Sequence, residues 1–188
     1  MKNSNPLQSL TVLCLMVAIG CTDSTPEQQS QSSVAASSTQ DDSTEAATLP
    51  KYTIVAGKGT EGIQLGEDRQ CAIDVLGEPS SNSAGYLEFL DAGVDIAYIK
   101  SGQIRTAFFY YRSPEHGAFD GQTARGIGRD SSVEDVLELY GKPSRVGEST
   151  ISEFGAKPGA REKSLDYSEL GITFTFWDDE LADIRVYE

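Results

Sequence analysis

A polar segment near the N-terminus limits which part of the chain can form a hydrophobic core. Residues 22–50 are rich in Ser, Thr, Gln and Ala, and they include no aromatic and no basic residue. Such a composition cannot bury enough apolar surface to offset the chain entropy lost on folding. We therefore predict a disordered acidic tether over residues 21–50 and one globular domain over residues 51–188, which is a normal domain length.

The first 20 residues have the pattern of a signal peptide. Lys2 gives a short positive region, and an apolar run from Leu10 to Ile19 follows it. This run is too short to span a hydrocarbon layer of about 30 Å. It ends in Ala18-Ile19-Gly20-Cys21, which resembles a bacterial lipobox and predicts cleavage between Gly20 and Cys21.

A lipobox implies a lipoprotein that is held to a membrane by acyl chains on Cys21. Each buried CH₂ group contributes about 0.8 kcal/mol, so two or three long chains would anchor the protein essentially permanently. Thr22, rather than Asp, follows the cysteine, which in this type of lipoprotein is compatible with an outer membrane and a domain in the periplasm. Ordinary secretion after cleavage at Gly20 and an uncleaved anchor are the alternatives.

The charge of the chain excludes one large class of partners. The formal net charge is −14, and residues 51–188 carry 14 basic against 24 acidic side chains. Nucleic-acid binding needs clustered Lys and Arg to neutralise phosphates, so we expect no nucleic-acid partner. Three cysteines and one histidine also leave little for a metal site or a disulfide framework, and we expect no cofactor.

Short motifs recur within residues 51–188. Gly62-Ile63 recurs as Gly126-Ile127, and the pattern Gly-x-Pro-Ser at residues 77–80 recurs at 141–144. The strand-like pattern of residues 93–98 recurs at 171–176, after an insertion around residues 148–163. These matches predict a tandem duplication with repeats at about 51–112 and 113–188.

Each repeat is expected to fold as a helix followed by an antiparallel meander. The first helix covers about residues 68–76, and the second starts at the capping box Ser131-x-x-Glu134. The second helix has an apolar face at Val133, Val136, Leu137 and Tyr140. Strands are expected at residues 86–90, 94–99, 103–111, 164–167, 172–177 and 181–187, with an edge strand at 52–56. The predicted fold is α+β, a tandem duplication in which helices pack on one face of a three- to four-stranded meander.

This arrangement of Gly-Ile, helix, Gly-x-Pro and Gly-Ile/Val-x-Phe-x-Phe motifs resembles the repeat of the β-lactamase-inhibitor-protein-like and small outer-membrane-assembly lipoproteins. The resemblance covers nearly all of residues 51–188. It implies helices on one side and a broad free sheet face that grips a protein. The contact residues of the inhibitor do not align with this chain, so none is transferred.

Strand alternation separates a core face from a free face, since residues two apart lie on the same side. Val94, Ile96 and Tyr98, together with Ile172, Phe174 and Phe176, are expected to face the core, with Ala107, Phe109, Ile184 and Val186. The free face has the aromatic and arginine content of protein-binding hot spots. Its candidate binding residues are Ile99, Phe108, Tyr110, Thr175, Trp177, Arg185 and Tyr187. The alternative is that these aromatics pack beneath residues 145–163 or 112–125.

The sequence gives little support for an enzyme. His116 is expected to be a surface-loop histidine without a catalytic partner, and Cys71 a buried small hydrophobic residue. No nucleophile-elbow, zinc-protease or phosphate-loop motif is present. Asp178-Asp179-Glu180 could hold a hard cation such as Ca²⁺, although a solvated turn explains these acids more simply.

The sequence as a whole predicts a membrane-anchored, non-catalytic lipoprotein that binds another protein of the cell envelope. That partner, of unknown identity, could be an envelope-assembly component or a hydrolase to be inhibited. One alternative is a structural or sensory domain that binds ions or cationic peptides weakly. Another is a hydrolase that uses Asp and Glu alone.

Overall fold

A computed structural model describes residues 50–188. The predicted signal peptide, Gly20, Cys21 and the tether up to residue 49 lie outside the described residues. Within residues 50–188, no helix is both long enough and apolar enough to cross a membrane.

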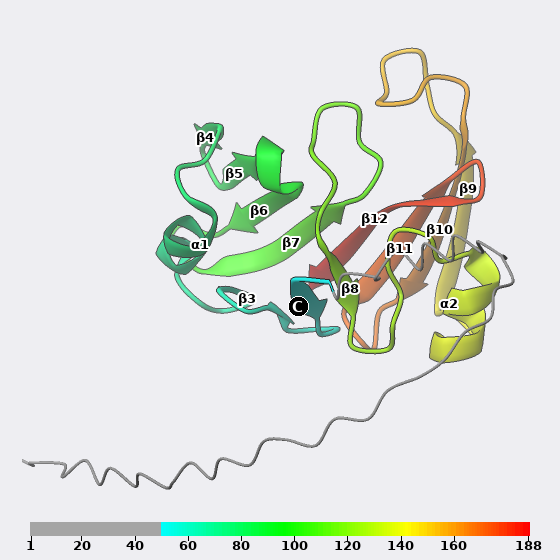
Figure 1. Ribbon diagram of the computed structural model, residues 1–188, viewed down its shortest axis with the longest axis horizontal. Coiled ribbons are helices and arrows are strands. Elements are labelled where there is room, and N and C mark those ends of the chain that lie inside the picture. The colour runs from blue at the N-terminus through cyan, green and yellow to red at the C-terminus, as the bar shows by residue number, and fades with distance from the viewer. Residues whose placement is uncertain (1–49) are drawn as a thin grey trace, which may run out of the picture. The chain divides into compact units, whose positions relative to one another are not determined.

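One antiparallel sheet of eight strands dominates the domain (Figure 1). Its two central strands come from distant parts of the sequence, because β12 pairs with β7 and places Ile184 opposite Phe109. In spatial order the strands are β4 (Ser81–Ser83), β5 (Tyr86–Phe89), β6 (Val94–Tyr98), β7 (Ile104–Tyr110), β12 (Glu180–Tyr187), β11 (Ile172–Trp177), β10 (Arg161–Tyr167) and β9 (Arg145–Thr150).

Short elements complete the domain. β1 (Tyr52–Ile54) pairs in parallel with β8 (Gly121–Thr123), and β2 (Gly59–Thr60) pairs with β3 (Ile63–Gln64). The predicted edge strand at residues 52–56 is therefore a strand of a separate two-stranded sheet. The helices are α1 (Arg69–Leu76), α2 (Val133–Tyr140) and the 3₁₀ helix η1 (Leu90–Ala92).

The predicted fold class is wrong. The described chain is mostly β, with one continuous eight-stranded sheet and two α-helices of eight residues each, rather than a duplicated helix-plus-meander unit with helices packed on the sheet. A helix of this length spans about 12 Å, whereas eight strands spaced by about 4.8 Å extend over about 35 Å. The helices bury only Ala72, Val133 and Val136. Much of the remaining cover comes from Ile54, Ile63, Phe119 and Ile127 in short strands and connectors.

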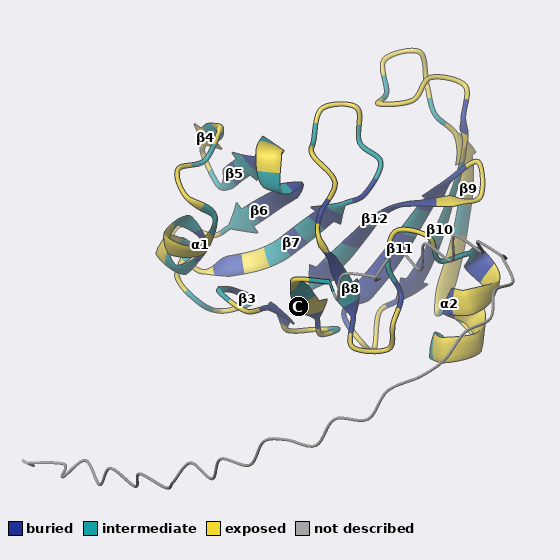
Figure 2. Ribbon diagram, viewed as in Figure 1, coloured by how far each residue is buried: buried dark blue, intermediate teal, exposed yellow. Residues whose placement is uncertain are grey.

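The division of the strands into two faces is confirmed. Val94, Ile96, Ala107 and Phe109 are fully buried on one side, as are Ile172, Phe174, Phe176, Ile184 and Val186. Tyr98 is partly buried against the same core. Figure 2 shows the buried residues concentrated along β7, β12 and β11. The period-two pattern of apolar side chains therefore determines which face of the sheet forms the core.

The ends of the helices follow the predicted signals with one shift. The capping box at α2 uses Ser132 and Asp135 in place of Ser131 and Glu134, and each side chain accepts the backbone N–H of the other residue. Both helices end at a glycine with positive φ, Gly77 and Gly141, as expected for a residue without Cβ. Leu137 is 40% exposed, so its expected place on the buried face of the helix is wrong.

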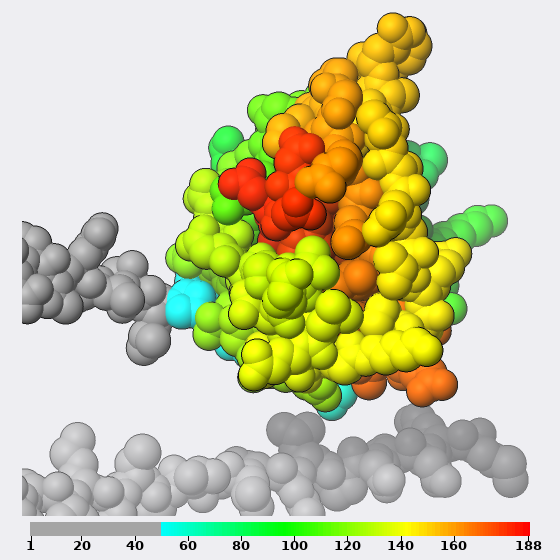
Figure 3. Space-filling model, turned by 90° about the vertical axis from the view of Figure 1, so that its right-hand side faces the viewer, coloured from blue at the N-terminus to red at the C-terminus, as the bar shows by residue number. Residues whose placement is uncertain are grey.

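The predicted insertion around residues 148–163 extends a hairpin. β9 and β10 pair from Arg145 opposite Asp166 to Thr150 opposite Arg161. The loop over residues 151–160 extends past the ends of β9 and β10 (Figure 1), and it forms the yellow-orange projection at the top of Figure 3. Phe154 in this loop is 91% exposed.

Candidate functional site

The free face of the sheet presents two adjacent lines of side chains across its central strands. One line runs from Tyr110 on β7 through Asp183 and Thr175 to Ser164 on β10. The second line runs from Phe108 through Arg185, Thr173 and Asp166 to Arg145 on β9. Cross-strand register therefore brings together residues that are up to 77 positions apart in the sequence, such as Phe108 and Arg185.

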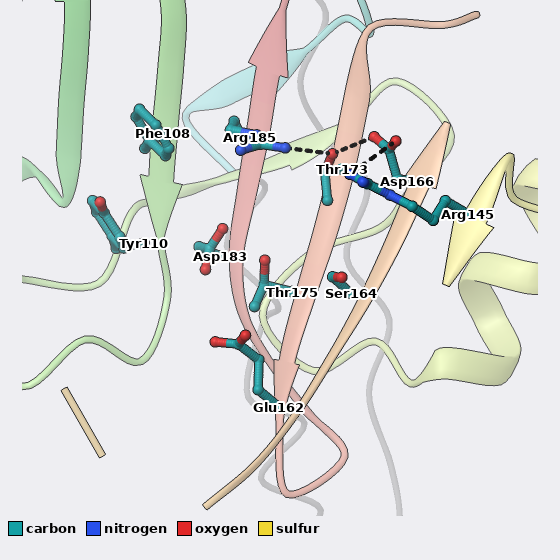
Figure 4. A pocket seen from close by; sticks show the side chains of 10 residues that line it. All are labelled: Phe108, Tyr110, Arg145, Glu162, Ser164, Asp166, Thr173, Thr175, Asp183 and Arg185. Carbon is teal, nitrogen blue, oxygen red and sulfur yellow. Dashed lines mark hydrogen bonds and ion pairs between the residues drawn. The ribbon is translucent and has the colours of Figure 1, made fainter. Parts of the chain in front are cut away.

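These lines border a hollow of about 400 Å³ (Figure 4). Glu162 of β10 also lines the hollow, and the remaining residues belong to the two lines described above. A volume of this size is within the usual range of ligand and side-chain pockets. The hollow is rich in charge: Arg145 and Arg185 lie on its wall with Glu162, Asp166 and Asp183.

Asp166 is the centre of a hydrogen-bond network on one side of the hollow. Its Oδ1 accepts the hydroxyl of Thr173 at 2.8 Å and that of Tyr187 at 2.5 Å, while its Oδ2 lies 3.7 Å from the Arg145 guanidinium. Arg185 donates to Thr173 at 3.3 Å. Although burial acts in the opposite direction, hydrogen bonds from Tyr187 and Thr173, with the nearby arginines, lower the pKa of Asp166. This carboxylate is therefore held in its charged form.

Asp183 has the opposite electrostatic character. Burial raises the pKa of Asp183 to about 7, Glu162 adds to the rise, and Thr175 and Arg185 partly oppose it. No ion pair within 4 Å involves Asp183 among residues 50–188. The hollow thus holds one firmly charged carboxylate and one that changes protonation near neutral pH.

Aromatic side chains border the hollow on the β7 side. Phe108 lies between Tyr86 and Tyr110, with ring centroids at 6.2 and 6.4 Å. Burial and the neighbouring Asp95 raise the pKa of Tyr86 to about 12 and that of Tyr110 further still. Both phenols donate to Asp95 Oδ2, at 3.2 and 3.1 Å, so they remain neutral donors under ordinary conditions.

His116 is not the surface-loop histidine that the sequence predicts. Its side chain is only 9% exposed, its ring stacks on Tyr110 at 4.1 Å, and Nε2 lies 3.0 Å from Asp95 Oδ1. Nδ1 lies 2.9 Å from Ser113 Oγ, which also accepts the backbone N–H of Glu115. These contacts hold the connector between β7 and β8 against the free face of the sheet. The sequence around His116 does not predict this structural role.

The structure brings together five of the seven predicted binding residues. Phe108, Tyr110, Thr175 and Arg185 line the hollow, and Tyr187 contacts it through Asp166. Ile99 is 41% exposed but lies beyond the end of β6, away from the hollow. Trp177 is only 8% exposed and packs with Ala160 and Ala182 under Ile151, so for this residue the structure shows the packing alternative.

Six of the ten residues that line the hollow were not predicted from the sequence. Arg145, Glu162, Ser164, Asp166, Thr173 and Asp183 were not among the predicted binding residues. Asp183 and Thr173 could have been found, because each lies two positions from a selected residue on the same strand. Arg145 and Glu162 lie in strand segments that the sequence did not predict.

Two further expectations concern acids and thiols. The cation site considered at Asp178, Asp179 and Glu180 is a turn in which Asp178 pairs with Lys157 at 2.9 Å and Asp179 with Arg161 at 2.6 Å. Residues 50–188 contain no group of three His, Cys, Asp or Glu that could hold a metal ion. Cys71 is a free, partly exposed thiol on α1 rather than a fully buried one.

Comparison with known proteins gives little information about this chain. No protein-family model matches it, and no curated protein matches it. A crystal structure of a DUF4309 family protein (YjgB) from Bacillus subtilis aligns with a TM-score of 0.42 and 12% identity, covering 70% of this chain and 87% of that one. This likeness is too distant to support an argument about function. The resemblance to inhibitor-like and assembly lipoproteins stays a prediction.

Proposed function

We propose that the protein is a membrane-anchored, non-catalytic lipoprotein that binds another protein of the cell envelope through the free face of its sheet. The observation that supports this proposal is the hollow over β7, β12, β11 and β10, which combines aromatic rings with charged groups. Aromatic and arginine side chains are the residues that most often dominate binding energy at protein interfaces.

The chemistry of the hollow favours a partner that presents both polar and charged groups. Arg145 and Arg185 can receive a carboxylate, while Glu162, and Asp183 when it is ionised, can receive a basic side chain. Such complementary charges contribute mainly to specificity and to the rate of association. The acidic domain itself disfavours docking onto anionic lipid, so membrane attachment is assigned to Cys21.

Site-specific photo-crosslinking in the native envelope tests the binding face. A benzoyl-phenylalanine at position 108 should give one discrete crosslinked protein, whereas the same probe at Leu137, an exposed position on α2, should not. Adding Arg185→Ala to the probe at position 108 should reduce the adduct at least about tenfold, since hot-spot residues contribute about 2 kcal/mol or more. The proposal would be contradicted by equal yields of crosslinked adduct from positions 108 and 137. It would also be contradicted if Arg185→Ala left the yield from position 108 unchanged.

Metabolic labelling with radioactive palmitate tests the anchor separately. The full chain should incorporate label and fractionate with membranes, and Cys21→Ala should abolish both, because Cys21 supplies the acylated sulfur. Cys71→Ala is the matched control, since it removes the other cysteine expected in the mature chain and should leave labelling unchanged. Labelling that survives Cys21→Ala would rule out lipidation at this residue.

A further inference from the structure

A second cavity lies beside the buried Trp177, at the end of the free face. It has a volume of about 420 Å³. Its wall combines Arg112, Ser113 and His116 from the connector after β7 with Arg129, with Lys157 from the protruding loop, and with Trp177 and Glu180. Four separate segments of the chain therefore meet around it.

Two hydrogen-bond donors on residues of this wall have no acceptor within the described part of the chain. The indole Nε1 of Trp177 and the Nε of Arg112 are both buried, and neither donates a hydrogen bond to any group of residues 50–188. A buried donor without a partner is costly to the fold, and a bound water or ion that supplies the acceptor is one explanation for such a group. Trp177 itself is more than nine-tenths buried, so bulk water does not satisfy its N–H.

Positive charge collects at this cavity in an otherwise acidic domain. Arg112, Arg129 and Lys157 line it against a single lining acid, Glu180, although residues 51–188 carry 24 acidic and only 14 basic side chains. Arg129 forms no ion pair within 4 Å among residues 50–188. An anion would therefore be attracted to this position more than to the rest of the domain.

The existing ion pairs of these cations leave room for a ligand. Arg112 lies 3.5 Å from Asp130 and 3.9 Å from Glu180, and both acids are more than half exposed. Lys157 pairs with Asp178 at 2.9 Å, with both side chains nearly half exposed. Exposed pairs of this kind contribute little to stability, so an oxyanion that contacts several donors at once can compete with them.

We propose that this cavity binds a small organic oxyanion, a carboxylate or a phosphate ester. The anionic head would lie among Arg112, Arg129 and Lys157 and would supply acceptors that the protein does not provide. The volume exceeds what an inorganic ion fills, and the apolar surfaces of Trp177, Tyr111 and Ala118 can contact an organic body. This site is distinct from the hollow on β7 and β12 and does not depend on the proposed protein-binding function.

The only tryptophan of the chain makes the site directly observable. In ¹⁵N-labelled protein, the single indole N–H resonance should shift saturably when phenyl phosphate or benzoate is added at constant ionic strength. Inorganic phosphate should bind more weakly than phenyl phosphate, because it lacks the organic body. Benzyl alcohol serves as the neutral control and should cause no saturable shift.

Substitutions locate the site independently of the reporter. Arg129→Ala removes an exposed cation that pairs with no acid within residues 50–188, and it should weaken phenyl phosphate binding at least about fivefold. Lys142→Ala removes an exposed cation outside the cavity and should leave the affinity unchanged. Trp177→Phe, measured by calorimetry, should also weaken binding because it deletes the indole donor while keeping an aromatic ring.

Three results would overturn the inference. The first is the absence of a saturable indole shift with either organic anion up to about 10 mM, a concentration that corresponds to a binding free energy near −3 kcal/mol. The second is an equal shift with benzyl alcohol, which would indicate an apolar site rather than an anion site. The third is an equal affinity in the Arg129→Ala and Lys142→Ala variants.

Discussion

Replacing Phe174 with alanine is expected to lower the free energy of unfolding by about 3–5 kcal/mol. The ring is fully buried in the middle of β11 and packs against Tyr140 at 4.9 Å and Tyr167 at 6.0 Å. The substitution removes a large apolar side chain and leaves a cavity that the rigid sheet cannot close. Since domains are stable by only about 5–15 kcal/mol, urea unfolding should show a greatly lowered midpoint.

Phe154→Ala is the matched control for this prediction. The same change of side chain at a position that is 91% exposed should alter the free energy of unfolding by no more than about 0.5 kcal/mol. Comparable losses from the two substitutions would contradict the assignment of Phe174 to the core and of Phe154 to the tip of the protruding loop.

Asp183→Asn is expected to stabilise the protein at pH 8 and to have almost no effect at pH 4. In the folded state Asp183 keeps its proton up to about pH 7, whereas in the unfolded chain it loses the proton near its ordinary pKa of 3.8. Between these two pH values the folded state therefore binds more protons than the unfolded state does. The free energy of unfolding of the wild type consequently falls as the pH rises from about 4 to about 7. A pKa difference of this size corresponds to about 4 kcal/mol, which is the upper limit of the expected gain.

Asp166→Asn provides a control with the opposite sign. The pKa of Asp166 is lowered in the folded state, so its charge stabilises the fold above its ordinary pKa and this contribution is lost as the pH falls. We expect Asp166→Asn to destabilise the protein at pH 8 and to differ little from wild type under strongly acidic conditions. Chemical denaturation of both variants across the pH range checks the prediction, and parallel pH profiles for wild type and Asp183→Asn would contradict it.

Local sequence patterns predict the interior of the sheet well, because alternation depends only on neighbouring residues. The run Ile172-Thr173-Phe174-Thr175-Phe176 shows both the strand and its buried side. The same reasoning identifies Phe108, Tyr110, Thr175 and Arg185 as residues of the free face. The strands β4 and β9 were missed because they lie at the two edges of the sheet and consist mainly of polar residues, which give no alternating apolar signal.

These local patterns do not predict which strands pair when they lie far apart in the sequence. Nothing near His116 in the sequence indicates that its imidazole contacts Asp95, a β6 residue 21 positions earlier. Similarly, the pairing of β7 with β12 merges two meanders into one sheet, and this is why the predicted fold class was wrong. Such contacts depend on the order of the strands in space, which local periodicity does not determine.

The central position of β12 has a consequence for the time at which the domain can fold during synthesis. β7 ends at residue 110, but β12, which pairs with one of its two edges, begins only at residue 180. At about 5–20 residues per second, a ribosome needs several seconds to make the intervening segment. During that time β7 presents an unpaired edge that includes Phe109, and unpaired strand edges promote aggregation. The sheet therefore cannot be completed until residues 180–187 are available to pair with β7.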